Sequence, residues 1–136
     1  MNYAWRRHVK QDVLVDTSIW IDFFRHPDAE SGAEMVRLLK LGHVSTCGVI
    51  VAEILQGAAN ENELKELGEN LKGLSFLDAD ESAYVEAGRL SYNLRKRGRT
   101  VPLTDALIAN LAIRYQQTLW TKDAHFRGIP GLELKP

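Results

Sequence analysis

Short apolar runs alternate along the chain with longer segments in which apolar side chains recur at helical spacing. The short runs are rich in β-branched and aromatic residues, which is typical of buried parallel strands. They cover residues 13–15, 44–46, 74–77 and 119–121, with a short edge strand at 132–134. The longer segments predict helices over 19–25, 33–41, 48–57, 62–71, 81–97 and 104–115. This alternation favours an α/β fold, a three-layer α/β/α sandwich with a mostly parallel central sheet and right-handed crossovers.

Three of the predicted helices carry specific expectations. Residues 48–57 are apolar nearly all round, which predicts a buried helix around Glu53. The longest predicted helix is expected to include Tyr84 and Val85 in its inner face. Thr104 is expected to cap the helix that follows it, because threonine is a favourable N-cap residue.

Composition narrows the class of protein. The chain has 136 residues, of which 45% are hydrophobic, and this is typical of one folded domain. The single cysteine, Cys47, excludes a disulfide scaffold and fits a reducing cytosol. No apolar run approaches the ~20 residues that a transmembrane helix needs, and the polar, basic start is not a signal peptide. We therefore expect a soluble cytoplasmic protein with no membrane partner, an N-terminal extension at 1–11 and a single domain at 12–136.

Acidic side chains follow two of the predicted strands and begin one helix. Asp16 directly follows the first strand, Asp123 lies just past the fourth, and Asp105 lies in the first turn of a helix. In an open parallel sheet, ligands bind beyond the carboxyl ends of the strands. Each acid also has a simpler interpretation: Asp16 as a helix cap, Asp105 as an acid at a helix N-terminus, and Asp123 as a loop acid.

Glu53 is harder to explain as a structural residue. Burying an unpaired carboxylate costs several kcal/mol, so such a group is normally paired or binds a metal. No Lys or Arg occurs over residues 41–64, so a neutralising cation would have to come from a distant part of the chain. A distant salt bridge stays open as the alternative. The sharper hypothesis is that Glu53 meets Asp16, Asp105 and Asp123 around a hard divalent cation.

Four carboxylates around one cation suit phosphodiester chemistry. Mg²⁺ and Mn²⁺ take oxygen ligands in octahedral geometry and are often held by carboxylates together with substrate phosphates. Such a metal activates a bound water and stabilises the leaving oxygen. Thr17, Ser18 and Thr121 are expected to orient the ligands through their hydroxyls. The chain lacks Asp-x-Asp after the first strand, a Walker loop, Gly-x-Gly-x-x-Gly and zinc-type histidine spacing, which disfavours other phosphate enzymes and zinc.

Four motifs, taken in order, closely resemble a PIN domain. They are the residues at 16–18, 52–57, 104–109 and 119–123: Asp-Thr-Ser, Ala-Glu-Ile-Leu-Gln-Gly, Thr-Asp-Ala-Leu-Ile-Ala and Leu-Trp-Thr-Lys-Asp. The nearest resemblance is to the VapC-type toxin nucleases of bacterial and archaeal toxin–antitoxin pairs, and it runs from about Asp12 to the C-terminus. Two features depart from the usual pattern. Residues 1–11 precede the usual start, and Cys47 stands where relatives often have Ser or Thr before the helix that carries the glutamate.

The resemblance implies a Mg²⁺- or Mn²⁺-dependent endoribonuclease whose targets are RNAs such as tRNA, rRNA or mRNA. It implies that Asp16, Glu53, Asp105 and Asp123 are both the catalytic and the metal-binding residues. It also implies a homodimer and a small cognate antitoxin that inserts a peptide across the active-site groove. Two other functions stay open: a non-catalytic PIN-like module that binds RNA or a partner, and a different metal-dependent phosphoesterase acting on DNA or a small phosphate ester.

Basic residues gather beside two of the acids, although the net charge is only −1. The candidates for contacts to RNA phosphates are Arg95, Arg97, Arg99, Lys122 and Arg127. They are either cations that complement a helix C-terminus or phosphate contacts that position RNA without reading its sequence. We interpret the near-neutral total as two opposed populations, acids that hold metal and bases that hold phosphate.

Overall fold

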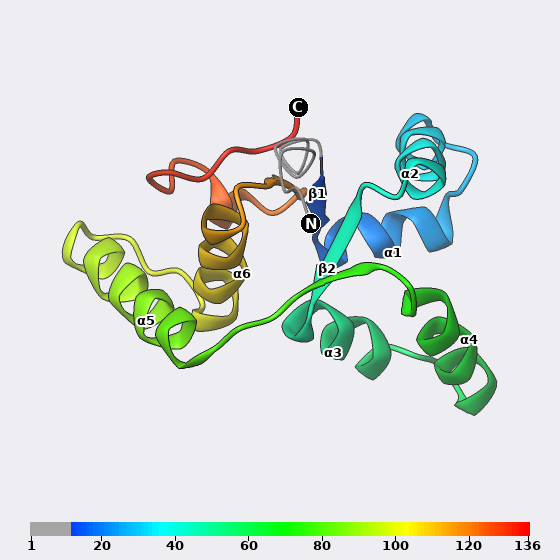
Figure 1. The fold of residues 1–136 in the computed structure, drawn as a ribbon, viewed down its shortest axis with the longest axis horizontal. Helices are drawn as coiled ribbons and strands as arrows, with labels where there is room; N and C mark the ends of the chain where they lie inside the picture. Colours follow the sequence, from blue (N-terminus) through cyan, green and yellow to red (C-terminus); the bar gives the residue numbers. More distant parts are fainter. Residues whose placement is uncertain (1–11) are drawn as a thin grey trace, which may run out of the picture.

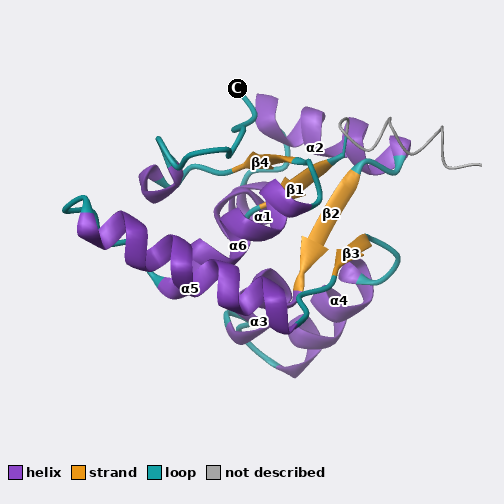
Figure 2. Ribbon diagram, turned by 60° about the vertical axis from the view of Figure 1, so that its left-hand side comes forward, coloured by secondary structure: helices purple, strands orange, loops and turns teal. Residues whose placement is uncertain are grey.

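The computed structural model describes residues 12–136, and the extension predicted at 1–11 lies outside the described residues. The strands are β1 (Val13–Val15), β2 (Val44–Cys47), β3 (Ser75–Leu77) and β4 (Thr118–Trp120). The helices are α1 (Thr17–Arg25), α2 (Glu30–Leu41), α3 (Gly48–Gln56), α4 (Glu61–Leu71), α5 (Glu81–Lys96), α6 (Leu103–Arg114) and the 3₁₀ turn η2 (Ala124–Phe126). Figure 2 shows the short strands surrounded by these helices, which confirms the predicted α/β fold.

The four strands form one parallel sheet in the order β3-β2-β1-β4. The chain moves outward from β1 to β2 and β3, and then returns across the sheet to β4. With right-handed crossovers, this change of direction places α1–α4 on one face and α5 and α6 on the other, as Figure 1 shows. The sheet therefore changes direction between β1 and β4, which is where open α/β sheets bind ligands beyond the carboxyl ends of their strands.

The centre of the sheet is also the centre of the core. Leu14 and Val15 of β1 are completely buried, because a strand covered on both faces can expose neither row of side chains. Leu119 of β4 is buried to the same degree, and its backbone pairs with the C-terminal segment. That segment forms a single bridge between Leu119 and Leu134 instead of the edge strand predicted at 132–134.

Two helices differ from prediction at their ends or faces. Helix α6 begins at Leu103, and the Pro102 carbonyl accepts the Ala106 N–H at 3.0 Å, so Thr104 lies inside the first turn and does not cap the helix. The exposed Tyr84 and Val85 of α5 are 59% and 56% accessible, so they do not lie on its inner face as predicted. Small residues take that face, because they allow α5 to pack closely against α6.

Helix α3 is less buried than its apolar sequence predicted. Ile50 and Ile54 are buried, but Ala52 is exposed and Glu53 is only half-buried. Cys47 takes the N-cap position of α3 without a side-chain cap hydrogen bond, and its side chain is completely buried. Over the part of the chain that is described, no helix is long and apolar enough to cross a membrane.

Candidate active site

Asp16 follows β1 directly, and two hydroxyls hold its carboxylate. Thr121 Oγ1 donates to Asp16 Oδ2 at 2.7 Å, and Ser18 Oγ donates to the same oxygen at 3.2 Å. Asp16 occupies the N-cap position of α1, but its side chain makes no cap hydrogen bond. The simpler interpretation of Asp16 as a helix cap is therefore wrong for its side chain, which faces the β4 end and not the helix backbone.

The loop after β4 is tied to the same hydroxyls. The Asp123 N–H donates to Thr121 Oγ1 at 3.0 Å, and the Lys122 N–H donates to Ser18 Oγ at 3.0 Å. Thr121 thus links the acid that follows β1 with the acid that follows β4, across 105 positions of sequence to Asp16. Because these contacts use neutral groups, they fix the position of the acids without cancelling their charge.

Glu53 reaches this cluster from α3, on the helix-covered face of the sheet. Thr17 Oγ1 donates to Glu53 Oε1 at 3.1 Å, and within the described part of the chain no ion pair forms with this carboxylate. Partial burial raises the pKa of Glu53, and the nearby carboxylates of Asp16 and Asp105 raise it further, against the opposing effect of the Thr17 hydroxyl. The distant salt bridge left open by the sequence is therefore absent among residues 12–136.

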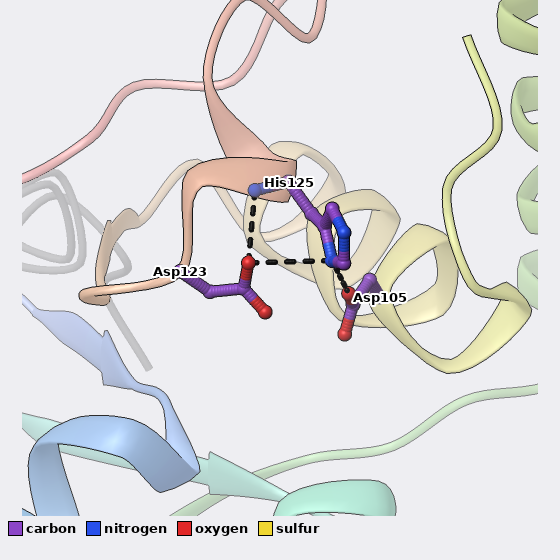
Figure 3. Close-up of side chains that lie close together, drawn as sticks. All are labelled: Asp105, Asp123 and His125. Carbon is purple, nitrogen blue, oxygen red and sulfur yellow. Dashed lines mark hydrogen bonds and ion pairs between the residues drawn. The ribbon is translucent and has the colours of Figure 1, made fainter.

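Asp105 and Asp123 lie on either side of a histidine (Figure 3). His125 Nδ1 is 3.2 Å from Asp105 Oδ2 and 3.3 Å from Asp123 Oδ1, and the His125 backbone N–H donates to Asp123 Oδ1 at 2.9 Å. Burial and then the Asp123 charge raise the pKa of Asp105, although His125 opposes this shift. One ligand atom from each of these three residues lies within 4.8 Å of the other two.

The residues fit a divalent cation. The neighbouring charges that raise the pKa of Glu53 and of Asp105 include Asp16 in both cases, so the four predicted acids act on one another as one cluster. Such mutual repulsion is what a bound cation relieves, and carboxylate oxygens are ligands that hard cations prefer. The cluster is therefore of the kind that holds a metal, with Thr17, Ser18 and Thr121 bonded to its members as the sequence predicted.

The predicted phosphate contacts are not all beside the acids. Arg95 and Arg97 lie at the C-terminal end of α5, where the Arg95 guanidinium stands 5.7 Å from the Tyr92 ring centre. Lys122 Nζ pairs with Asp22 at 3.2 Å.

Arg99 donates to the His125 carbonyl and so braces the turn that carries the histidine. Arg127, just past that turn, is exposed.

His125 is the residue of this cluster that the sequence did not single out as a metal-site candidate. Its signal was present in the spacing Asp123-Ala124-His125, because a 3₁₀ turn brings side chains two positions apart onto the same acid. That spacing is common in turns and carries little information by itself.

Comparison with known proteins gives one family throughout. The family model of the PIN domain matches residues 13–132. Ribonuclease VapC11 of Mycobacterium tuberculosis is 35% identical over 118 residues, which cover 84% of this chain and 88% of the relative. Ribonuclease VapC1 of Methanocaldococcus jannaschii is 27% identical over 124 residues, which cover 90% of this chain and 85% of the relative.

Solved structures agree in fold. VapBC2 from Rickettsia felis, bound to a DNA fragment from its promoter, matches with a TM-score of 0.77 at 24% identity, over 90% of this chain and 96% of that chain. VapBC-1 from nontypeable Haemophilus influenzae matches with a TM-score of 0.75 at 23% identity, over the same shares of the two chains. These similarities cover the whole described α/β unit.

Proposed function

The chain belongs to the PIN domain family, and from that premise we propose that it is a Mg²⁺- or Mn²⁺-dependent endoribonuclease, the toxin of a toxin–antitoxin pair. The observation that carries the proposal is the convergence of four carboxylates from β1, α3, α6 and the loop after β4. They meet at the point where the sheet changes direction, the usual ligand site of such folds. The named ribonuclease relatives support RNA as the substrate.

In this mechanism Asp16, Glu53, Asp105 and Asp123 hold the cation. A cation held here supplies an activated water and neutralises charge on the phosphate and the leaving oxygen. Thr121 and Ser18 keep the Asp16 carboxylate oriented, and Thr17 does the same for Glu53. The half-burial of Glu53 and of Asp105 limits competition from bulk water for the cation.

Basic residues beside the cluster are proposed to hold RNA phosphates. Lys122 and Arg127 lie on either side of Asp123 in sequence, and Arg99 braces the same turn from within hydrogen-bonding distance of its backbone. Such contacts place the backbone of RNA and carry no base information. Arg95 and Arg97, at the end of α5, would contact a more distant part of the RNA.

We propose a homodimer and a cognate antitoxin as partners, acting in the cytoplasm. An exposed apolar surface supports the homodimer: Phe76, Tyr84 and Val85 are 51%, 59% and 56% accessible. They border a hollow whose wall includes Val49 and Ala52 of α3. Apolar surface of this kind is typical of protein interfaces. The antitoxin is proposed from the solved toxin–antitoxin relatives, whose VapBC names pair two proteins.

Cleavage assays on purified protein test the enzymatic proposal. The intact chain is incubated with tRNA, rRNA and mRNA, a DNA duplex and a phosphate monoester, each with Mg²⁺, Mn²⁺ or EDTA. We expect metal-dependent cleavage of RNA only. Asp16→Asn and Asp105→Asn should each lower the rate by about 100-fold or more, since the metal contributes several kcal/mol to transition-state stabilisation. Asp28→Asn, at an exposed loop position, is the matched control.

Two results would contradict the proposal. Cleavage that survives both Asp16→Asn and Asp105→Asn would show that the acidic cluster is not the catalytic centre. Cleavage of DNA or of the monoester in preference to RNA would favour a different phosphoesterase. RNA binding without any cleavage, under conditions in which metal binds, would favour a non-catalytic module.

A further inference from the structure

The imidazole of His125 lies among the carboxylates, although the turn does not need an imidazole to form. The His125 backbone N–H donates to Asp123, and its backbone carbonyl accepts from Arg99. Any residue could make these two backbone contacts at position 125. The ring itself is 53% exposed, and its Nδ1 lies between Asp105 and Asp123, as Figure 3 shows. The backbone thus delivers the nitrogen to the cluster, and the side chain is left to interact with what binds there.

We propose that His125 supplies a nitrogen ligand to the cation held by Asp105 and Asp123, and that this centre therefore prefers Mn²⁺ to Mg²⁺. This inference rests on the proposed metal-dependent function. Imidazole suits transition metals, whereas Mg²⁺ favours carboxylate, carbonyl and water oxygens. An all-carboxylate centre leaves this choice to metal availability, but a centre with one imidazole does not.

The distances between the ligand atoms support this assignment. With metal–ligand bonds of about 2.1 Å in an octahedron, adjacent ligand atoms lie about 3.0 Å apart. His125 Nδ1 is 3.2 Å from Asp105 Oδ2 and 3.3 Å from Asp123 Oδ1. The nitrogen and the two oxygens therefore already have separations close to those of neighbouring ligands, so binding requires only small shifts of exposed or half-buried side chains.

A simpler role for the ring is to balance the negative charge of the two acids. That role requires a hydrogen bond or a positive charge, and it makes no distinction between two divalent cations of equal charge. Direct ligation does make the distinction, and it places a nitrogen nucleus in contact with the metal. The two roles therefore differ in a measurement that does not depend on catalysis.

Pulsed electron paramagnetic resonance on bound Mn²⁺ makes this measurement. The full chain, prepared without a polyhistidine tag, is loaded with Mn²⁺ alone, and the spin echo is examined for modulation by a coordinated nitrogen. Calorimetric titrations with Mn²⁺ and with Mg²⁺ run in parallel on the wild type, His125→Ala and His125→Gln. His26→Gln, at an exposed histidine at the end of α1, is the control.

We expect nitrogen modulation in the wild type and in His26→Gln, and none in either His125 variant. The Kd for Mn²⁺ should rise about tenfold or more in His125→Ala, since even indirect ligand partners contribute that much. The Kd for Mg²⁺ should stay within about a factor of three, because Mg²⁺ prefers oxygen and keeps several of its waters. Circular dichroism should show the fold unchanged, since the backbone contacts of residue 125 remain.

The outcomes separate this inference from the function on which it rests. Mn²⁺ binding that Asp105→Asn abolishes, but without nitrogen modulation, overturns the ligand role of His125 and leaves the metal-dependent function standing. Equal losses of Mn²⁺ and Mg²⁺ affinity in His125→Ala also overturn it, since they indicate charge balance alone. Failure of the wild type to bind either metal overturns both.

Discussion

Replacing Glu53 with glutamine should stabilise the metal-free protein while it abolishes activity. The substitution keeps the size of the side chain and leaves an amide oxygen to accept from Thr17 Oγ1. It removes a half-buried charge that Asp16 and Asp105 repel. A functional site that holds like charges together lowers stability, and relieving it raises stability at the expense of function.

The expected gain in the free energy of unfolding is about 1 kcal/mol at pH 7, since a partly exposed carboxylate is screened by water and escapes the larger cost of full burial. For a domain of this size, that gain raises the melting temperature by about 3–5 °C. Asp105→Asn should give a smaller gain, because it also weakens the contact with His125 that compensates Asp105.

The pH dependence follows from the sign of the shift. The pKa of Glu53 is raised in the fold above its ordinary value of 4.5, so the folded state retains a proton where the unfolded chain has lost it. Its contribution to stability is therefore complete below the unfolded pKa and declines as the pH rises through the folded one. The wild type and Glu53→Gln should be about equally stable near pH 4 and should diverge toward pH 7.

Thermal unfolding followed by circular dichroism in EDTA measures these differences, with Glu66→Gln on the exposed surface of α4 as the control. Added Mn²⁺ or Mg²⁺ should raise the melting temperature of the wild type more than that of Glu53→Gln, because binding to the folded state alone stabilises it. A Glu53→Gln protein less stable than the wild type in EDTA at pH 7 would refute the reasoning, as would a difference that persists unchanged at pH 4.

Three further outcomes are expected. Thr121→Val, which loses its hydrogen bonds to two of the acids, should lower kcat about 10- to 100-fold in RNA cleavage, whereas Thr121→Ser should stay close to the wild type. Hydrogen bonds from Arg37 and then Lys135 lower the pKa of Glu34 from 4.5 to about 2. Wild type should therefore exceed Glu34→Gln in urea-unfolding stability by under about 1 kcal/mol above pH 4.5, and lose this advantage as the pH falls through about 2. Leu14→Ala should cost about 2–5 kcal/mol in the same urea assay, and Leu14→Met less than about 1.5 kcal/mol, because Leu14 is completely buried.

The acids that follow strands were the most predictable part of the site. Asp16 and Asp123 are adjacent in space because β1 and β4 are parallel neighbours, and the carboxyl ends of parallel strands meet at one edge. Short β-branched runs identify such strands from sequence with little ambiguity here. The pairing of Thr121 with Asp16 was not predictable in detail, because it depends on the register between β1 and β4, which no local pattern gives.

Surface exposure was the least predictable part. An apolar periodicity shows that a face avoids water, but it does not show which element covers that face. Helix α3 reads as buried all round, yet Ala52 is exposed and Glu53 is half-buried. The same holds for Tyr84 and Val85 of α5, which are exposed while smaller residues pack on α6. Sequence patterns average over the whole assembly in which a chain functions, whereas these exposures belong to a single copy.

The way in which the acids are held bears directly on their use. A protein that needed these carboxylates only for stability could pair them with arginine or lysine, which would lower their pKa values and remove the repulsion. Among residues 12–136, Asp16 and Glu53 are instead held by hydroxyls, which orient an oxygen but add no charge. The repulsion is thereby preserved in the folded state, as the raised pKa of Glu53 indicates. A cation that binds here gains the interaction energy that an internal salt bridge would have used, which is the physical basis for a site that binds metal strongly.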